Sequence, residues 1–183
     1  HGRMDTIFNE RARLRPEVIE AKERGVVFDV GHGAGSYHFD VARAAFEHHF
    51  YPDTISSDLH TLSIDGPVYD MPTTISKFLN IGMSLEDAIA KSTIAPARAI
   101  GREHEMGSLK VGMPADIAVF EILEGEFDFY DTHGNRLKGT KKLSAVATFR
   151  EGARVEIDPA RRNYRRPLKK PEIRIIESLR EQY

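Results

Sequence analysis

The strongest constraint on the fold is a change of pattern near Gly107 in this chain of 183 residues. Before it, stretches with the apolar spacing of helices alternate with short runs of β-branched and aromatic residues. After it, apolar residues recur at every second position, as they do in half-buried strands. Helices that alternate with strands are typical of a parallel sheet or a barrel. We therefore predict an α/β unit over 1–106, a β segment over 107–158 and a separate tail over 159–183.

Start and stop signals mark the individual elements. Pro16 suits the first turn of a helix, and Gly25 suits the position just past its end. A buried strand over 26–30 and a second strand over 54–57 follow. The other predicted helices span 36–50, with Ser36 as the cap, 73–81, 84–93, where Ser84 and Asp87 have nearly the spacing of a capping box, and 95–100. The later strands span 117–120, 127–130 and 143–150. A complete eightfold barrel takes about 250 residues, so this chain is too short for a barrel followed by a β segment.

Composition excludes several kinds of chemistry. The chain has no cysteine, so disulfides, thiolate zinc sites and cysteine nucleophiles are ruled out. No apolar run approaches the roughly 20 residues of a membrane span, and a membrane is not an expected partner. A chain without cysteine suits a reducing compartment, and together with a polar start it predicts a cytoplasmic protein.

Charge is concentrated in the tail. The whole chain carries 26 Lys and Arg against 28 Asp and Glu, a net charge of −2, but residues 159–183 hold eight basic side chains against three Glu. A basic tail is one signature of nucleic-acid binding. This tail has few aromatic residues and no nucleic-acid motif. We therefore favour a solvated or docking arm and do not expect a nucleic-acid partner.

Two polar residues stand directly after the two predicted strands of the α/β unit. His32 follows the first strand between Gly31 and Gly33, and Asp58 follows the second. Functional sites of parallel α/β folds lie at the carboxyl ends of strands. An imidazole is a good zinc ligand, and a carboxylate can bind a metal or move a proton. Each residue also has a structural alternative, because a histidine in such a loop is more often packed than ligating and an aspartate often forms a turn or a cap.

Longer motifs carry a family resemblance. Residues 28–33, Phe-Asp-Val-Gly-His-Gly, and residues 56–60, Ser-Ser-Asp-Leu-His, resemble the ends of the sixth and eighth strands in the amidohydrolase superfamily. Residues 92–101 resemble its closing helix, and the pattern Gly-x-Leu-x-x-Gly-x-x-Ala-Asp over 107–116 resembles its return into a small β domain. The stretch 58–74 is similar to the dihydroorotase-like branch, which includes N-acyl amino acid deacetylases.

This resemblance implies a fold and a reaction. The fold is the C-terminal portion of a TIM-type (β/α)8 barrel, comprising its last strands and helices, followed by strands of a small β-sandwich domain. The reaction is hydrolysis that uses one or two divalent ions, usually Zn²⁺, to activate water. By position, the resemblance makes His32 and Asp58 metal ligands. It gives Asp58 the further catalytic role of taking a proton from the water and passing it to the leaving amine.

The remaining ligands of the superfamily are missing from this sequence. A His-x-His pair is absent, and His48 and His49 are adjacent on a predicted helix, so they point in different directions. We therefore expect this chain to be the C-terminal part of a longer amidohydrolase and to lack a full metal site alone. Association with the missing N-terminal part, or a homo-oligomer, is the expected assembly.

Four further residues are candidates for the substrate pocket: His60, Gly33, Tyr37 and Met71. Three of them have a structural alternative. His60 can orient Asp58 or shape its own loop, Tyr37 can pack at the start of a helix, and Met71 can pack the loop before it.

Together these features support hydrolysis of a linear amide or related acyl bond in a small molecule, with N-acyl amino acids as the first substrates to try. A cyclic amide hydrolase of the dihydroorotase kind is the alternative among enzymes. A pseudoenzyme subunit or assembly module that docks through its tail is the alternative outside them.

Overall fold

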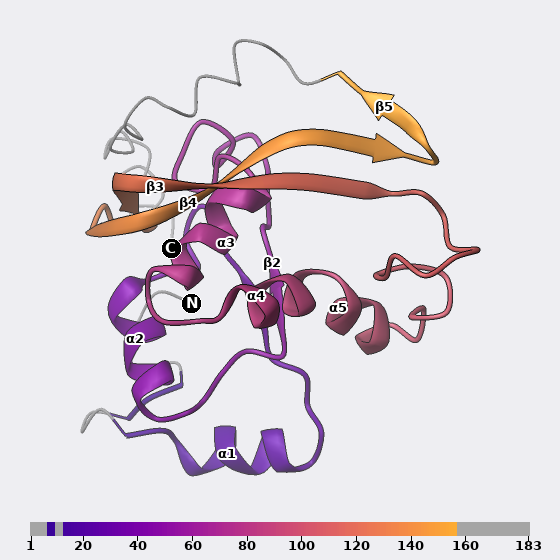
Figure 1. Cartoon of the computed structure of the whole chain (residues 1–183). Coiled ribbons are helices and arrows are strands. Elements are labelled where there is room, and N and C mark those ends of the chain that lie inside the picture. The colour runs from indigo at the N-terminus through magenta and orange to yellow at the C-terminus, as the bar shows by residue number, and fades with distance from the viewer. Residues whose placement is uncertain (1–6, 10–12, 157–183) are drawn as a thin grey trace.

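The computed structural model describes residues 7–9 and 13–156. The elements follow in the order α1 (Pro16–Glu23), β1 (Asp29–Gly31), α2 (Phe39–Glu47), β2 (Thr54–Ser56), α3 (Met71–Leu79), α4 (Leu85–Ser92), α5 (Ile94–Ala99), β3 (Ile117–Tyr130), β4 (Arg136–Arg150) and β5 (Ala153–Val155). Helices and strands alternate at first and strands alone follow, which confirms the α/β class (Figure 1). The predicted boundary after residue 106 falls between α5 and β3, and the tail over 159–183 lies outside the described residues.

The first two strands form a short parallel pair. Asp29 lies opposite Thr54, and Gly31 lies opposite Ser56. The carboxylate of Asp29 accepts hydrogen bonds from the Thr54 hydroxyl at 2.7 Å and the Ser56 hydroxyl at 2.5 Å. Because the strands are parallel and in register, the residues that follow them emerge at the same edge.

The start of the first strand differs from its prediction. A buried strand was expected over 26–30, but Val26 and Val27 are 48% and 50% exposed. The Val26 N–H donates to the Ala21 carbonyl at 3.0 Å and so completes the turn that ends α1. The strand β1 therefore begins only at Asp29, after the turn that ends α1.

Side-chain caps determine where three helices begin. Asp70 accepts the Thr73 N–H at 2.7 Å at the start of α3. At the start of α4, Ser84 accepts the Asp87 N–H at 3.1 Å, as the spacing of these two residues predicted. The predicted cap of α2 is wrong, because His38 and not Ser36 takes that position. The His38 Nδ1 accepts the Asp40 N–H at 3.1 Å, so the cap lies two residues later than predicted and α2 begins at Phe39.

The C-terminal strands form one antiparallel sheet in the order β3-β4-β5. Two separate strands were predicted over 117–120 and 127–130, but β3 is a single strand through both. The register shifts between Glu124 and Phe127, next to Gly125, whose φ is 158°. A bulge there absorbs the polar stretch between the two apolar runs without ending the strand.

A single apolar core joins the sheet to the α/β unit. Figure 1 shows β3 and β4 crossing over α3. Buried residues from both parts pack together: Ile55, Ile75, Phe78, Phe129, Leu137 and Leu143. Hydrogen bonds fix the contact, because the Ser76 hydroxyl accepts the Leu143 N–H at 2.9 Å and the side-chain Oδ1 of Asn80 accepts the Thr140 N–H at 2.8 Å. The sheet is thus held directly against α3.

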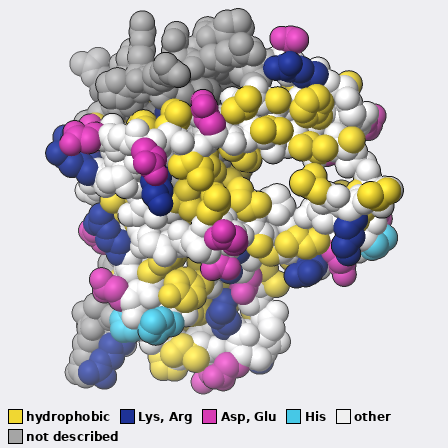
Figure 2. All heavy atoms as spheres, in the orientation of Figure 1, with side chains coloured by type: hydrophobic (Ala, Val, Ile, Leu, Met, Phe, Trp, Pro, Cys, Tyr) yellow, Lys and Arg dark blue, Asp and Glu magenta, His cyan; other side chains and the backbone are white. Residues whose placement is uncertain are grey.

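Beside this core, a large groove of about 990 Å³ lies between the helices and the sheet. Its apolar lining includes Ile89, Met106, Leu109, Phe120 and Ile122. Figure 2 shows hydrophobic side chains gathered around a hollow in the surface. None of the helices in the described ranges has the length and apolar character needed to cross a membrane.

Candidate functional site

The two predicted strand ends lie side by side. The His32 N–H donates to the Ser56 carbonyl at 3.4 Å, and the Gly33 N–H donates to the Ser57 carbonyl at 3.0 Å. These bonds continue the parallel pairing one step past each strand. They carry the glycine-rich loop up to Asp58. The resemblance to the sixth and eighth strands of a barrel placed one strand between the two, and this part of the prediction is wrong, because β1 and β2 pair directly.

Gly33 lies directly against the Asp58 carboxylate. Its φ is +50°, in the left-handed region that favours glycine, and an added Cβ would overlap Oδ2 of Asp58. Asp58 is exposed and has a left-handed backbone of its own, with φ at +45°. Aspartate tolerates this conformation better than most residues. The carboxylate is therefore presented to solvent at the strand edge with glycine as its immediate neighbour.

His32 is fully buried, and its whole ring is in contact with the protein. Nε2 lies 2.6 Å from Nζ of Lys77, and Nδ1 lies 3.0 Å from the Gly33 carbonyl oxygen. One ring face stacks on Tyr37 with centroids 4.6 Å apart. Burial and, next, the charge of Lys77 lower the pKa of His32 well below its usual value, so the ring is neutral.

Lys77 is the residue that the sequence analysis missed. It is fully buried in α3, and besides His32 its Nζ donates to the carbonyl oxygens of Pro67 at 2.8 Å and Tyr130 at 2.7 Å. Burial lowers the pKa of Lys77 to about 7, while the charges of Asp131 and Asp70 oppose the shift. The only sequence signal was its place between Ile75 and Phe78, inside a helix that the core covers.

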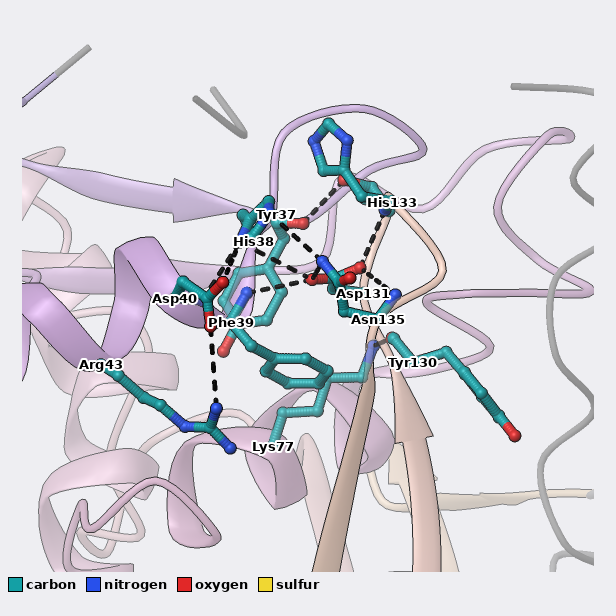
Figure 3. Close-up of polar contacts among 11 residues, drawn as sticks. Tyr37, His38, Phe39, Asp40, Arg43, Lys77, Tyr130, Asp131, His133 and Asn135 are labelled. Carbon is teal, nitrogen blue, oxygen red and sulfur yellow. Dashed lines mark hydrogen bonds and ion pairs between the residues drawn. The ribbon is translucent and has the colours of Figure 1, made fainter. Parts of the chain in front are cut away.

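A buried aspartate ties the turn after β3 to the start of α2 (Figure 3). The Asp131 carboxylate accepts N–H bonds from Phe39 at 3.1 Å, His133 at 2.8 Å and Asn135 at 2.9 Å. The Thr132 hydroxyl donates to the Tyr37 carbonyl at 2.6 Å. This network holds the segment that carries Tyr37, and Figure 3 places Lys77 beside it.

A family model described as the amidohydrolase family matches residues 38–154. That range covers more than half of the chain. The chain belongs to the amidohydrolase family. Asp58, His60, Met71 and Lys77 lie inside the matched range, whereas His32 precedes it.

Relatives and solved structures agree with this membership. The amidohydrolase chain is 39% identical to a deacetylase of Brucella anthropi over 111 residues, which are 61% of this chain and 27% of that protein. It resembles the crystal structure of an adenine deaminase with a TM-score of 0.80 at 29% identity, over 85% of this chain and 43% of the other. For a dihydroorotase structure the TM-score is 0.69 at 30% identity, over 79% and 38%. The chain thus spans less than half the length of each of these proteins.

Amidohydrolases generally use divalent metals. Among the residues that the structure describes, no three His, Asp or Glu side chains are grouped so that they could hold an ion. Asp58 offers an exposed carboxylate, but both ring nitrogens of His32 already have partners. The described part of this amidohydrolase therefore does not by itself fit a metal ion.

The four predicted pocket residues are not brought together around one cavity. Tyr37 lines a cavity of about 160 Å³ between β1 and α2, and Met71 lines the large groove beside the sheet. Neither of these two cavities is lined by Asp58, Gly33 or His60. The Nδ1 of His60 accepts the Leu62 N–H at 3.3 Å, so this nitrogen shapes its own turn. Gly33 is the predicted pocket residue for which the structure gives an approach to the Asp58 carboxylate.

Proposed function

We propose that this chain supplies the Asp58 side of the active site of a metal-dependent hydrolase that cleaves a linear amide or related acyl bond. The observation that carries the proposal is the placing of Asp58, an exposed carboxylate at a parallel strand end with Gly33 packed against it. Family membership and the deacetylase relatives support hydrolysis of an acyl group from nitrogen. The proposed fold is the C-terminal portion of a (β/α)8 barrel followed by strands of a β-sandwich.

In the proposed reaction Asp58 moves one proton. Water adds to the carbonyl carbon of the substrate, and Asp58 accepts the proton that the water loses. The bond between carbon and nitrogen then breaks, and Asp58 returns the proton to the leaving amine, so that a carboxylic acid and an amine are released. An exposed carboxylate at a strand edge can reach both positions by rotation about its side chain.

The proposed cofactor of the complete protein is a divalent ion, with Zn²⁺ as the first to test. A bound ion would polarise the carbonyl and lower the pKa of water. Residues outside the described ranges have to complete its ligands. For His32 to act as a ligand, as predicted, its Nε2 has to release Lys77 and bind the ion instead. An unchanged metal content in His32→Ala would refute that role.

The substrate, the assembly and the location are further parts of the proposal. N-acetyl amino acids are the first small molecules to test. A cyclic amide is the second candidate, because the dihydroorotase structure matches with a TM-score of 0.69. In the complete protein, a preceding segment or a second copy of the chain would supply the other half of the site. We expect the complete protein to be cytoplasmic.

The deciding experiment compares Asp58→Asn with Asp65→Asn in the full-length protein. Both changes remove one exposed carboxylate from the same region between β2 and α3. We expect Asp58→Asn to lower kcat for N-acetyl amino acids by roughly 10²- to 10⁴-fold and Asp65→Asn to leave it near the unmodified value. Turnover of dihydroorotate alone would favour the cyclic substrate. No turnover of either class, in protein that binds no divalent ion, would favour the non-catalytic assembly module.

A further inference from the structure

Lys77 has the surroundings of a structural ammonium group. Three acceptors lie within 2.8 Å of Nζ, and they match the three N–H bonds that an ammonium can donate. No carboxylate of the described residues forms an ion pair with it within 4.0 Å. A buried cation is costly unless its hydrogen bonds are made, so the three acceptors must keep their places for Lys77 to remain there.

The three acceptors come from three separate parts of the chain. His32 follows β1, Pro67 belongs to the loop between β2 and α3, and Tyr130 ends β3. Lys77 therefore joins the strand end, the loop after Asp58 and the antiparallel sheet through one nitrogen atom. A contact of this kind fixes their relative positions more firmly than separate surface contacts would.

His32 has no nitrogen left for an ion in this arrangement. A metal ligand must present a ring lone pair, and the one on Nε2 points at Nζ of Lys77. Nδ1 faces the Gly33 carbonyl oxygen, and the ring is covered by Tyr37. These contacts are those of a side chain that supports the loop around it.

We infer that Lys77 and His32 form a buried positioning pair that holds Gly33 and the loop over 59–70 around Asp58, and that His32 is not a metal ligand. This inference rests on the proposed function, since it takes Asp58 as the reacting carboxylate.

The pair reaches Asp58 along two routes. On one side, His32 holds the Gly33 carbonyl, and Gly33 lies against the Asp58 carboxylate. On the other side, Lys77 holds the Pro67 carbonyl in the loop that begins after Asp58. Within that loop the buried Ser63 hydroxyl accepts the His60 N–H at 3.0 Å and lies 3.5 Å from the Asp58 carbonyl oxygen. Loss of Lys77 releases both routes at once.

The first test measures the proton position on His32 in the unmodified full-length protein by nitrogen NMR of labelled histidine. We expect a neutral ring with its proton on Nδ1 and an unprotonated Nε2 that accepts from Lys77. We also expect these signals to stay unchanged when Zn²⁺ is added or removed with a chelator. A proton on Nε2, or a shift of the His32 nitrogens on addition of Zn²⁺, would overturn the inference.

The second test compares Lys77→Met with Ser76→Ala in the full-length protein. Ser76 is the matched control, because it is a buried neighbour on α3 whose hydroxyl forms hydrogen bonds with Leu143 and Pro72, not with His32 or the loop over 59–70. We expect Lys77→Met to lower kcat by about 10- to 100-fold at similar KM and unchanged metal content, as loss of a supporting contact does. Ser76→Ala should lower Tm while kcat stays within about twofold of the unmodified value.

Two results would contradict the inference. One is loss of metal together with activity in His32→Gln, which would make His32 a direct ligand. The other is a Lys77→Met variant whose kcat falls no further than that of Ser76→Ala. If Lys77→Met does not fold, the NMR measurement on the unmodified protein decides the question. If the unmodified protein hydrolyses neither substrate class, the proposed function fails, but the NMR result still tests the pairing of Lys77 with His32.

Discussion

Replacement of Gly33 by alanine tests the contact on which the candidate site depends. Two separate effects are expected. The φ of +50° costs a residue with a Cβ about 1–2 kcal/mol of stability. The new Cβ would also overlap Oδ2 of Asp58, which is the far end of a side chain and can rotate away. We therefore expect a moderate loss of stability and a displaced carboxylate.

Gly35 in the same loop is the matched control. An added Cβ there meets no atom within 4 Å, and its φ is not in the left-handed region. Gly35→Ala should be neutral or stabilising by about 0.4–1 kcal/mol, because it only restricts the unfolded chain. Denaturant unfolding of the full-length variants should thus separate Gly33→Ala from Gly35→Ala by about 1.5–3 kcal/mol.

Activity separates the second effect from the first. A displacement of about 1 Å at a reacting group can cost on the order of 10²-fold in rate, so Gly33→Ala should lose about that factor in kcat and Gly35→Ala should lose none. Equal stabilities for the two variants would refute the argument from backbone conformation. A normal kcat in a destabilised Gly33→Ala would show that the glycine does not hold the carboxylate that reacts.

Two further predictions concern stability. Asp70→Ala removes the side chain that caps α3 with a 2.7 Å bond from the Thr73 N–H, and it should lower the free energy of unfolding by about 1 kcal/mol. Asp70→Ser keeps a side-chain acceptor and should retain most of the stability of the unmodified protein. Equal losses of stability in both variants would argue against the cap. Burial by itself raises the pKa of Asp53, but the hydrogen bonds from Lys22 and the Phe28 N–H outweigh it and hold that pKa below its usual value. A lowered pKa stabilises the fold above the unfolded pKa of about 3.9, and this contribution is lost as pH falls through the folded value. Between pH 6 and pH 2 the free energy of unfolding should therefore fall less in Asp53→Asn than in the unmodified protein. If it falls equally in both proteins, Asp53 is not the group that contributes this stability.

Local signals predicted most of the helices. Proline at position 16, glycine at 25 and the Ser84 cap each act within a few residues, and α1 and α4 lie where these signals place them. The cap of α2 was misplaced because two candidates stand within three positions. Ser36 and His38 both have side chains that can accept an N–H bond, and only His38 has the extended backbone next to the helix and the partner Asp40.

Strand limits were harder to predict because they depend on neighbours. Val26 and Val27 have high strand propensity, yet both are half exposed and Val26 finishes the turn after α1. The two short strands predicted over 117–130 join into β3 because β4 pairs along nearly its whole length and a bulge absorbs the mismatch. Pairing with a partner strand, rather than the composition of either run, decides where the strand ends.

The sequence by itself determined the α/β class, the order of the elements and the family resemblance, and it placed His32 and Asp58 at strand ends. Those features depend on periodicity and on short motifs, which act along the chain. That the two strands are direct neighbours came only from the structure. Only the tertiary structure showed what His32 touches, because Lys77 is 45 residues away and meets it through packing of α3. This contact is buried because α3 and the sheet pack together. Burial excludes water, so the amine of Lys77 needs three hydrogen bonds with the protein. No pattern in the chain records such a contact, and it is the contact that changes the role we assign to His32.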